Sequence, residues 1–192
     1  MGPPDHNSVY IVGQESQAGT YLLHIHLNSE ITLAFGRFRG GAGFTLPAGG
    51  YVYIGSALNP RGGLASRLLR HATRAGGPPH PIRERLLEHF RASGLGPPDL
   101  HPPRTKKLHW HVDYLLEQTN AELVGVYVIR VPARWEGAVA QWVAADPATN
   151  IIVPGLGAND VRGGTHLLQV LEGRGWWETL GARLEVRVPD FQ

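Results

Sequence analysis

Alternation of apolar and polar residues predicts a first strand over residues 20–27. One face of this segment is formed by Tyr21, Leu23, Ile25 and Leu27. The opposite face carries Leu22, His24 and His26, which we interpret as a semi-polar surface. Similar short segments predict further strands at 31–35, 51–54, 123–131, 166–171 and, in the tail, 184–188. The chain therefore contains several short strands.

Apolar residues spaced three and four positions apart predict helices between these strands. The clearest one covers residues 63–74, where the apolar stripe consists of Leu64, Leu68 and Ala72. Basic residues with the same spacing are expected on its opposite face, namely Arg67, Arg70, His71 and Arg74. Other helices are predicted at 82–92, 110–117 and 135–145. Helices mixed with a few strands indicate an α+β protein with a small antiparallel or mixed sheet.

The prolines and glycines gather in particular stretches of the chain, and we expect one domain with short extensions. Residues 1–17 are expected to form an N-terminal arm, residues 18–172 the domain, and residues 173–192 a C-terminal extension. Within the domain, residues 76–107 have prolines near both ends and one short amphipathic helix. We interpret this segment as an insertion outside the core sheet.

Composition narrows the classes of chemistry. Hydrophobic residues make up 42% of the 192 residues, which is enough for an ordinary core. The chain has no cysteine, which excludes disulfides, thiolate zinc sites and cysteine nucleophiles and suits a cytoplasmic location. No apolar run approaches the roughly 18 residues of a membrane span, and the first ten residues do not resemble a signal peptide.

The distribution of charge is more informative than its sum. The formal net charge is only +2, at a sequence pI of about 9.2. Both lysines and many arginines lie within residues 61–107, where carboxylates are few. This clustering favours a polyanionic partner, although a solvated basic face is an open alternative. The candidate nucleic-acid contacts are Arg61, Arg70, Arg74, Lys106 and Lys107.

Two short triplets and the helix that follows them resemble a known nuclease family. The triplets are Gly19-Thr20-Tyr21 and Tyr53-Ile54-Gly55, and the helix carries Arg67 and His71 one turn apart. This arrangement is similar to the GIY-YIG nuclease superfamily, with Gly-x-Tyr in the first triplet and a full match in the second. The resemblance implies a three-stranded core sheet flanked by helices, to which the 31–47 hairpin is added.

Additional segments resemble one uncharacterised group of GIY-YIG-like proteins, the DUF123-like subfamily. They are residues 50–57 (GYVYIGSA), 108–116 (LHWHVDYLL) and 153–160 (VPGLGAND), followed by His166-Leu167. Members of this group are sometimes fused to DNA-repair glycosylases. Two departures stand out: Val161 and Gly163 occupy positions that often hold cysteine, and Ala138 occupies the position of a second glutamate.

The resemblance implies a metal-dependent endonuclease that hydrolyses phosphodiesters, with DNA as the expected substrate and DNA repair as the expected process. Glu136 would bind one divalent ion, Mg²⁺ or Mn²⁺, which lowers the pKa of bound water and clamps an oxygen. Arg67 would grip the scissile phosphate. Tyr21 or Tyr53 would orient or deprotonate the water, and His71 would move a proton or bind phosphate.

Two other functions remain open. Ala138 favours a catalytically impaired module of the same fold that only binds nucleic acid, and a protein-interaction domain is the second rival. The remaining site candidates also have structural readings. His109, His111 and Asp113 could suggest a metal site, but i and i+2 diverge on a helix, so a structural hydrogen bond is favoured. Asp160 and His166 are expected to hold the glycine-rich loop in place.

Overall fold

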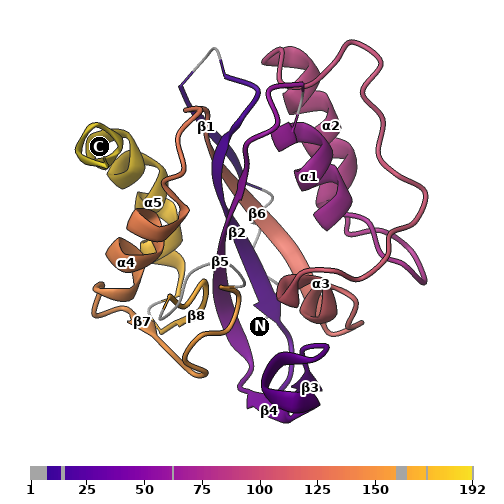
Figure 1. Cartoon of the computed structure of the whole chain (residues 1–192), viewed down its shortest axis with the longest axis vertical. Helices are drawn as coiled ribbons and strands as arrows, with labels where there is room; N and C mark the ends of the chain where they lie inside the picture. The colour runs from indigo at the N-terminus through magenta and orange to yellow at the C-terminus, as the bar shows by residue number, and fades with distance from the viewer. Residues whose placement is uncertain (1–7, 14–15, 62, 159–163, 172, 192) are drawn as a thin grey trace.

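The computed structural model describes residues 8–13, 16–61, 63–158, 164–171 and 173–191. Within them, six strands form one mixed sheet in the order β1-β6-β2-β5-β8-β7 (Figure 1). The strand bounds are β1 Ser8–Val12, β2 Gly19–Leu27, β5 Gly49–Ala57, β6 Ala121–Ile129, β7 Thr149–Asn150 and β8 Leu167–Val170. Strand β1 runs parallel to β6, and every other pair in this sheet is antiparallel.

The α+β class is therefore correct, but the expected three-stranded core is wrong. The central strands β6, β2 and β5 correspond to three predicted strands, and the sheet continues beyond them on both sides. On one side it gains β1, which lies within the segment expected as an arm. On the other it gains β8 and the two-residue strand β7. The expected hairpin forms separately, from β3 (Ile31–Ala34) and β4 (Gly43–Leu46).

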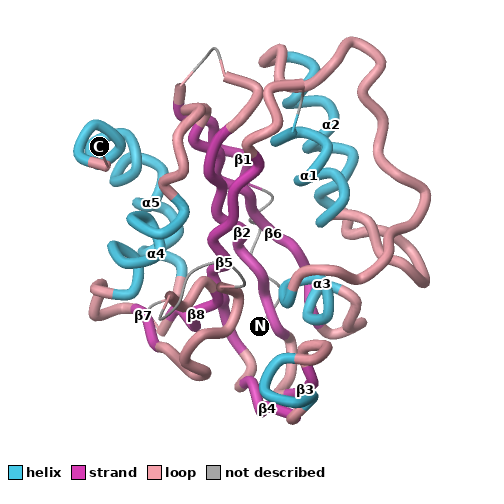
Figure 2. The backbone as a smooth tube through the Cα atoms, viewed as in Figure 1, coloured by secondary structure: helices cyan, strands magenta, loops and turns pink. Residues whose placement is uncertain are grey.

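Helices cover both faces of the large sheet (Figure 2). One face packs against α1 (Gly63–His71), α2 (Ile82–Ala92), α3 (His111–Leu116) and the β3–β4 hairpin. The opposite face packs against α4 (Glu136–Ala144) and α5 (Arg174–Arg187). Two 3₁₀ turns, Phe38–Gly41 and Val188–Asp190, complete the described elements. No described helix is long and apolar enough to cross a membrane.

The alternation of β2 divides its side chains between two hydrophobic clusters. Tyr21, Leu23 and Ile25 belong to the cluster beneath α1, α2 and α3, whereas Leu22 belongs to the cluster beneath α4 and α5. The expectation for His24 was wrong, because its side chain is buried and its ring stacks on Trp177 at 3.5 Å between ring centroids. A helix from the distant C-terminal segment covers this face, which the local pattern of β2 does not reveal.

The segment 76–107 is part of the folded core. Helix α2 has the predicted bounds and lies outside the sheet, but it buries Ile82, Leu86, Leu87 and Phe90 in the cluster shared with α1 and β6. The segment also supplies the buried Leu95, Leu100 and Lys106. It is therefore attached to the core much more firmly than an inserted surface loop would be.

The C-terminal segment is helical where a strand was predicted. Residues 184–188 alternate in polarity, yet they fall in the last turn of α5 and the 3₁₀ turn after it. Trp176, Trp177, Leu180 and Leu184 recur at helical spacing and are all buried against the sheet. This longer apolar stripe outweighs the short alternation near the end of the helix.

Candidate functional site

The register between β2 and β5 brings two tyrosines together. Tyr21 pairs with Gly55 and Leu23 pairs with Tyr53, so the two tyrosine side chains leave the same face of the sheet. Their ring centroids are 6.4 Å apart. Gly55 makes this possible, because a Cβ atom there would lie 2.5 Å from the Tyr21 hydroxyl oxygen. The glycine of the second triplet thus provides room for the tyrosine of the first.

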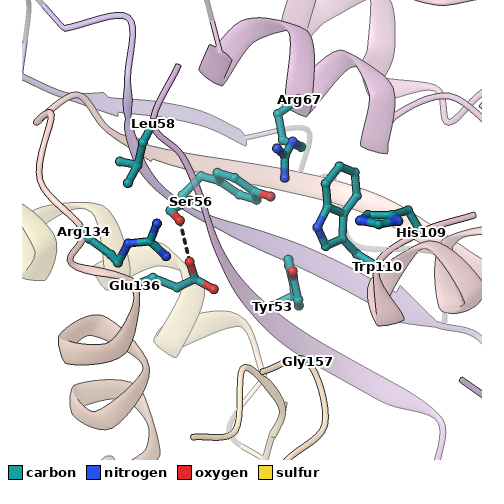
Figure 3. Close-up of a pocket in the computed structure, with 10 residues that line it drawn as sticks. Tyr53, Ser56, Leu58, Arg67, His109, Trp110, Arg134, Glu136 and Gly157 are labelled. Carbon is teal, nitrogen blue, oxygen red and sulfur yellow. Dashed lines mark hydrogen bonds between the residues drawn. The ribbon is translucent and has the colours of Figure 1, made fainter. Parts of the chain in front are cut away.

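A pocket of about 280 Å³ opens near the beginning of β2 and the end of β5. Figure 3 shows Arg67 and Trp110 on one side of it and Arg134 and Glu136 on the other, with Tyr53 between them. The lining also includes Tyr21, Ser56, Leu58, His109 and Gly157. Four of the five residues proposed as catalytic, Tyr21, Tyr53, Arg67 and Glu136, therefore share one cavity.

The fifth proposed residue, His71, lies directly behind Tyr21. Its Nε2 is 2.9 Å from the Tyr21 hydroxyl, and its Nδ1 is 3.5 Å from Oδ1 of Asp113. His71 was expected on the exposed face of α1 but is completely buried. Burial lowers the pKa of His71 to about 4, so the ring is neutral at neutral pH. The nearby Asp113 carboxylate favours the tautomer with its proton on Nδ1, which leaves Nε2 to accept a hydrogen bond from Tyr21.

Both tyrosine hydroxyls are protonated at neutral pH. Burial raises the pKa of Tyr21, although Arg67 opposes this, and burial raises the pKa of Tyr53 well above its ordinary value. Neither phenol is thus a free base in the resting protein. A proton acceptor must stand behind the tyrosine if it is to take a proton, and His71 occupies that place for Tyr21.

Asp113 is a structural anchor that joins α1 to α3. Its carboxylate accepts two hydrogen bonds from the Arg70 guanidinium, at 2.9 and 3.0 Å. It also accepts the backbone N–H groups of His109 and Trp110, at 2.8 and 3.0 Å. Although burial opposes ionisation, these donors and His71 hold the pKa of Asp113 far below its ordinary range. The structural hydrogen bond predicted between His109 and Asp113 is present through the main chain.

Glu136 stands at the first turn of α4 and is held at both oxygens. The Ser56 hydroxyl donates to Oε2 at 2.5 Å, and His166 Nδ1 lies 2.9 Å from Oε1. Burial alone would raise the pKa of Glu136. The hydrogen bonds from His166 and Ser56 outweigh this effect of burial, so the pKa of Glu136 lies below its ordinary value. The carboxylate is ionised at neutral pH and keeps partial exposure towards the pocket.

Several candidate phosphate contacts are used inside the protein instead. Arg70 is bound to Asp113, and Lys106 is buried with its Nζ 3.8 Å from Asp113 and 3.5 Å from Glu117. Arg74 donates to the main-chain carbonyls of Leu116, Gln118 and Ala121. The exposed candidates are Arg61 and Lys107. The basic face is thus smaller than the sequence suggests.

The remaining candidate site residues lie in different places. His109 lines the pocket, whereas His111 is not part of its lining and accepts the N–H of the lining residue Gly157 at its Nδ1, 3.0 Å away. His166 is buried beside Glu136. Asp160 lies outside the described residues. Among the described residues there is no group of three or more His, Asp or Glu side chains that could hold a metal ion.

A single-carboxylate metal site is nevertheless consistent with this pocket. Magnesium keeps much of its hydration and is commonly held by one or two carboxylates together with substrate phosphate. Glu136 is ionised, partly exposed and oriented by two hydrogen-bonding neighbours, as supporting partners of metal ligands usually are.

Ser56, Trp110 and Arg134 also line the pocket, although the sequence predicts no functional role for them. Ser56 and Trp110 lie within the segments 50–57 and 108–116 that carry the family resemblance, and this was the one signal available for them. Arg134 lies just before α4, and it helps to lower the pKa of Glu136.

Comparison with known proteins identifies one family. A family model described as "Domain of unknown function DUF123" matches residues 20–182, which include every described strand and helix from β3 to β8 and the whole pocket. No curated protein and no solved structure gives a match.

Proposed function

We propose that this chain, which belongs to the DUF123 family, is a metal-dependent endonuclease of the GIY-YIG type that hydrolyses phosphodiester bonds in DNA. The observation that carries the proposal is the single pocket that contains Tyr21, Tyr53, Arg67 and Glu136. A cation for phosphate, a carboxylate for a metal ion and a hydroxyl with a base behind it are the groups that such a reaction requires.

Arg67 is the group that would bind the scissile phosphate. Its guanidinium is planar and always charged, and it can donate two parallel hydrogen bonds to phosphate oxygens. No described carboxylate forms an ion pair with it, unlike the neighbouring Arg70. The charge of Arg67 is consequently available to an anion that enters the pocket.

Glu136 would hold the divalent cation, with Ser56 and His166 fixing the orientation of its carboxylate. When bound, Mg²⁺ or Mn²⁺ supplies an acidified water and stabilises negative charge on the phosphate. Arg134, exposed next to Glu136, adds positive charge on this side of the pocket.

Tyr21 would accept a proton from the attacking water while passing its own to His71. The hydroxyl is already hydrogen-bonded to Nε2, so both transfers follow one path. Proton uptake makes His71 a cation, which the ionised Asp113 behind Nδ1 stabilises. This path explains how a tyrosine with a raised pKa can still act as a base.

A binding module without cleavage is the second candidate. It is favoured by the hydrogen-bonding neighbours that both oxygens of Glu136 already have, and by the burial that raises the pKa of both tyrosines. In such a module Arg67 and the exposed Arg61 and Lys107 would contact phosphates, and the pocket would hold the backbone without breaking it.

A cleavage assay separates these candidates. Labelled single-stranded, linear duplex and branched DNA would be incubated with the protein in Mg²⁺, in Mn²⁺ or in EDTA. We expect metal-dependent cleavage that is lost in Glu136→Gln and kept in Glu88→Gln, a matched change at an exposed position of α2. Salt-dependent gel retardation without cleavage would instead identify the binding module, because phosphate contacts release counterions. If neither cleavage nor retardation is observed, the result would favour a protein-interaction domain.

A further inference from the structure

Trp110 contacts two arginines of α1. It directly precedes α3 and lines the pocket with a partly buried side chain. The Cζ atom of Arg67 lies 3.8 Å from the centroid of the Trp110 ring, and that of Arg70 lies 4.4 Å from it. Both distances are well within the range of a cation–π interaction, for which tryptophan is the strongest partner.

The two arginines differ in what else binds them. Arg70 donates to both carboxylate oxygens of Asp113 and to the carbonyl of Lys107, so its position is determined without Trp110. Arg67 forms no ion pair with a described carboxylate, and its described partners are the Tyr21 hydroxyl and the face of Trp110. The orientation of Arg67 thus depends on the ring much more than that of Arg70 does.

The position of Trp110 is itself fixed from the opposite direction. Its backbone N–H donates to Oδ2 of Asp113 at 3.0 Å, and its ring packs against the cluster beneath α1 and meets the buried ring of His71 edge-on. Asp113 therefore neutralises Arg70 and also places the indole that supports Arg67. Through this arrangement one arginine stays bound inside the protein and its neighbour remains available to the pocket.

We propose that Trp110 is a positioning residue that holds the Arg67 guanidinium in the pocket, ready for an anionic oxygen of the substrate. The identity of that oxygen as a phosphodiester rests on the proposed function. An arginine side chain has many rotamers, and orienting it before substrate binds removes a cost from the reaction. A ring that already contacts two guanidinium groups is poorly suited to stack on a nucleobase, so Trp110 acts through Arg67.

The first test does not depend on activity. The Nε–H signal of Arg67, assigned by its loss in Arg67→Lys, would be followed by ¹⁵N relaxation in wild type, Trp110→Phe and Trp110→Leu. The matched control is Trp142→Leu, which removes a partly buried tryptophan near Arg183 on the opposite side of the sheet. We expect the motion of the Arg67 Nε–H to increase strongly in Trp110→Leu, to increase less in Trp110→Phe, and to stay unchanged in Trp142→Leu.

The second test measures coupling between the two residues. Trp110→Leu should lower kcat about tenfold, from the loss of one cation–π contact, and change KM by less than about twofold. The same substitution in an Arg67→Ala background should have almost no further effect. If the wild-type protein does not cleave DNA, the proposed function fails. The same double-mutant cycle is then measured on the affinity for DNA in the absence of metal. Equal losses in both backgrounds, or unchanged motion of Arg67 in Trp110→Leu, would overturn the role of Trp110.

Discussion

The hydroxyl of Tyr21 lies 2.9 Å from Nε2 of His71, and both side chains are buried between α1 and the sheet. A second buried histidine, His80, accepts a hydrogen bond from the Leu123 N–H at its Nδ1. Its Nε2 lies 3.0 Å from the carbonyl oxygen of Leu116. Burial lowers the pKa of His71 to about 4 and that of His80 to about 3. Both rings are neutral in the folded protein at neutral pH.

Stability should therefore fall on mild acidification. A histidine has a pKa of about 6.5 when unfolded, so each ring contributes stability that is complete above that pH. The contribution is lost as pH falls from about 6.5 through the folded values, by at most about 1.4 kcal/mol per pH unit per histidine. Urea unfolding at pH 7.5, 6.0 and 5.0 measures this loss. His80→Gln should be destabilised at pH 7.5 but show a shallower pH dependence; an unchanged slope would mean that His80 titrates normally in the folded state.

Arg67 and Glu136 should act as one catalytic unit. Arg67→Ala and Glu136→Gln should each reduce the cleavage rate by several orders of magnitude, or about 3–5 kcal/mol of transition-state stabilisation. The double variant should be little worse than either single one. Single-turnover rates measure this, with Arg85→Ala on the exposed face of α2 as the control. If the loss of cleavage rate in the double variant equals the product of the two single losses, the two residues act independently.

His166 should support metal binding through Glu136. His166 Nδ1 lies 2.9 Å from Oε1, so His166→Gln should disturb the carboxylate without removing it. We expect Mn²⁺ affinity to fall about 10- to 100-fold, the usual effect of losing a partner of a metal ligand. Paramagnetic resonance of free Mn²⁺ provides the measurement, and Glu136→Gln marks complete loss of the site. Equal Mn²⁺ affinity in wild type and both variants would place the metal elsewhere.

Arg74 and Lys107 should differ in what they affect. Arg74 donates to four main-chain carbonyls, and Arg74→Ala would leave them without this charged donor, so it should destabilise the protein by about 3 kcal/mol. Lys107 is exposed, and Lys107→Ala should leave the unfolding free energy unchanged. For DNA binding we expect the reverse, with the salt slope reduced by about one contact in Lys107→Ala alone. Denaturation and anisotropy titrations at several salt concentrations distinguish the two.

The segment 76–107 should be indispensable for folding. Phe90 is completely buried against the main core, and Phe90→Ala should cost about 3–5 kcal/mol. Deleting the segment would remove all of α2 and the Lys106 partner of Asp113, so we expect no cooperative unfolding transition from the deletion variant. A cooperative transition near that of wild type would restore the view that the segment is a surface insertion.

The amino-acid pattern correctly predicts the strands and helices whose periodicity is complete within one segment. Strand β2 and helix α2 appear where their patterns predict them, because one apolar face of each strand or helix must be buried wherever it lies in the fold. The two triplets and the following helix also identified the tyrosines and Arg67, which line a single pocket in the structure.

The size of the sheet and the roles of the charged groups depend on contacts between distant segments of the chain. Strand β1 pairs with β6, more than a hundred residues later, and nothing local in either segment indicates that partner. His71, Arg70 and Lys106 resemble a solvated basic face in the sequence, yet all three contact Asp113. A charge or imidazole can be buried only where a partner compensates for lost hydration, and that partner comes from a distant part of the chain. Periodicity shows which face of a helix is polar, but only the assembled fold shows whether water or a carboxylate faces it.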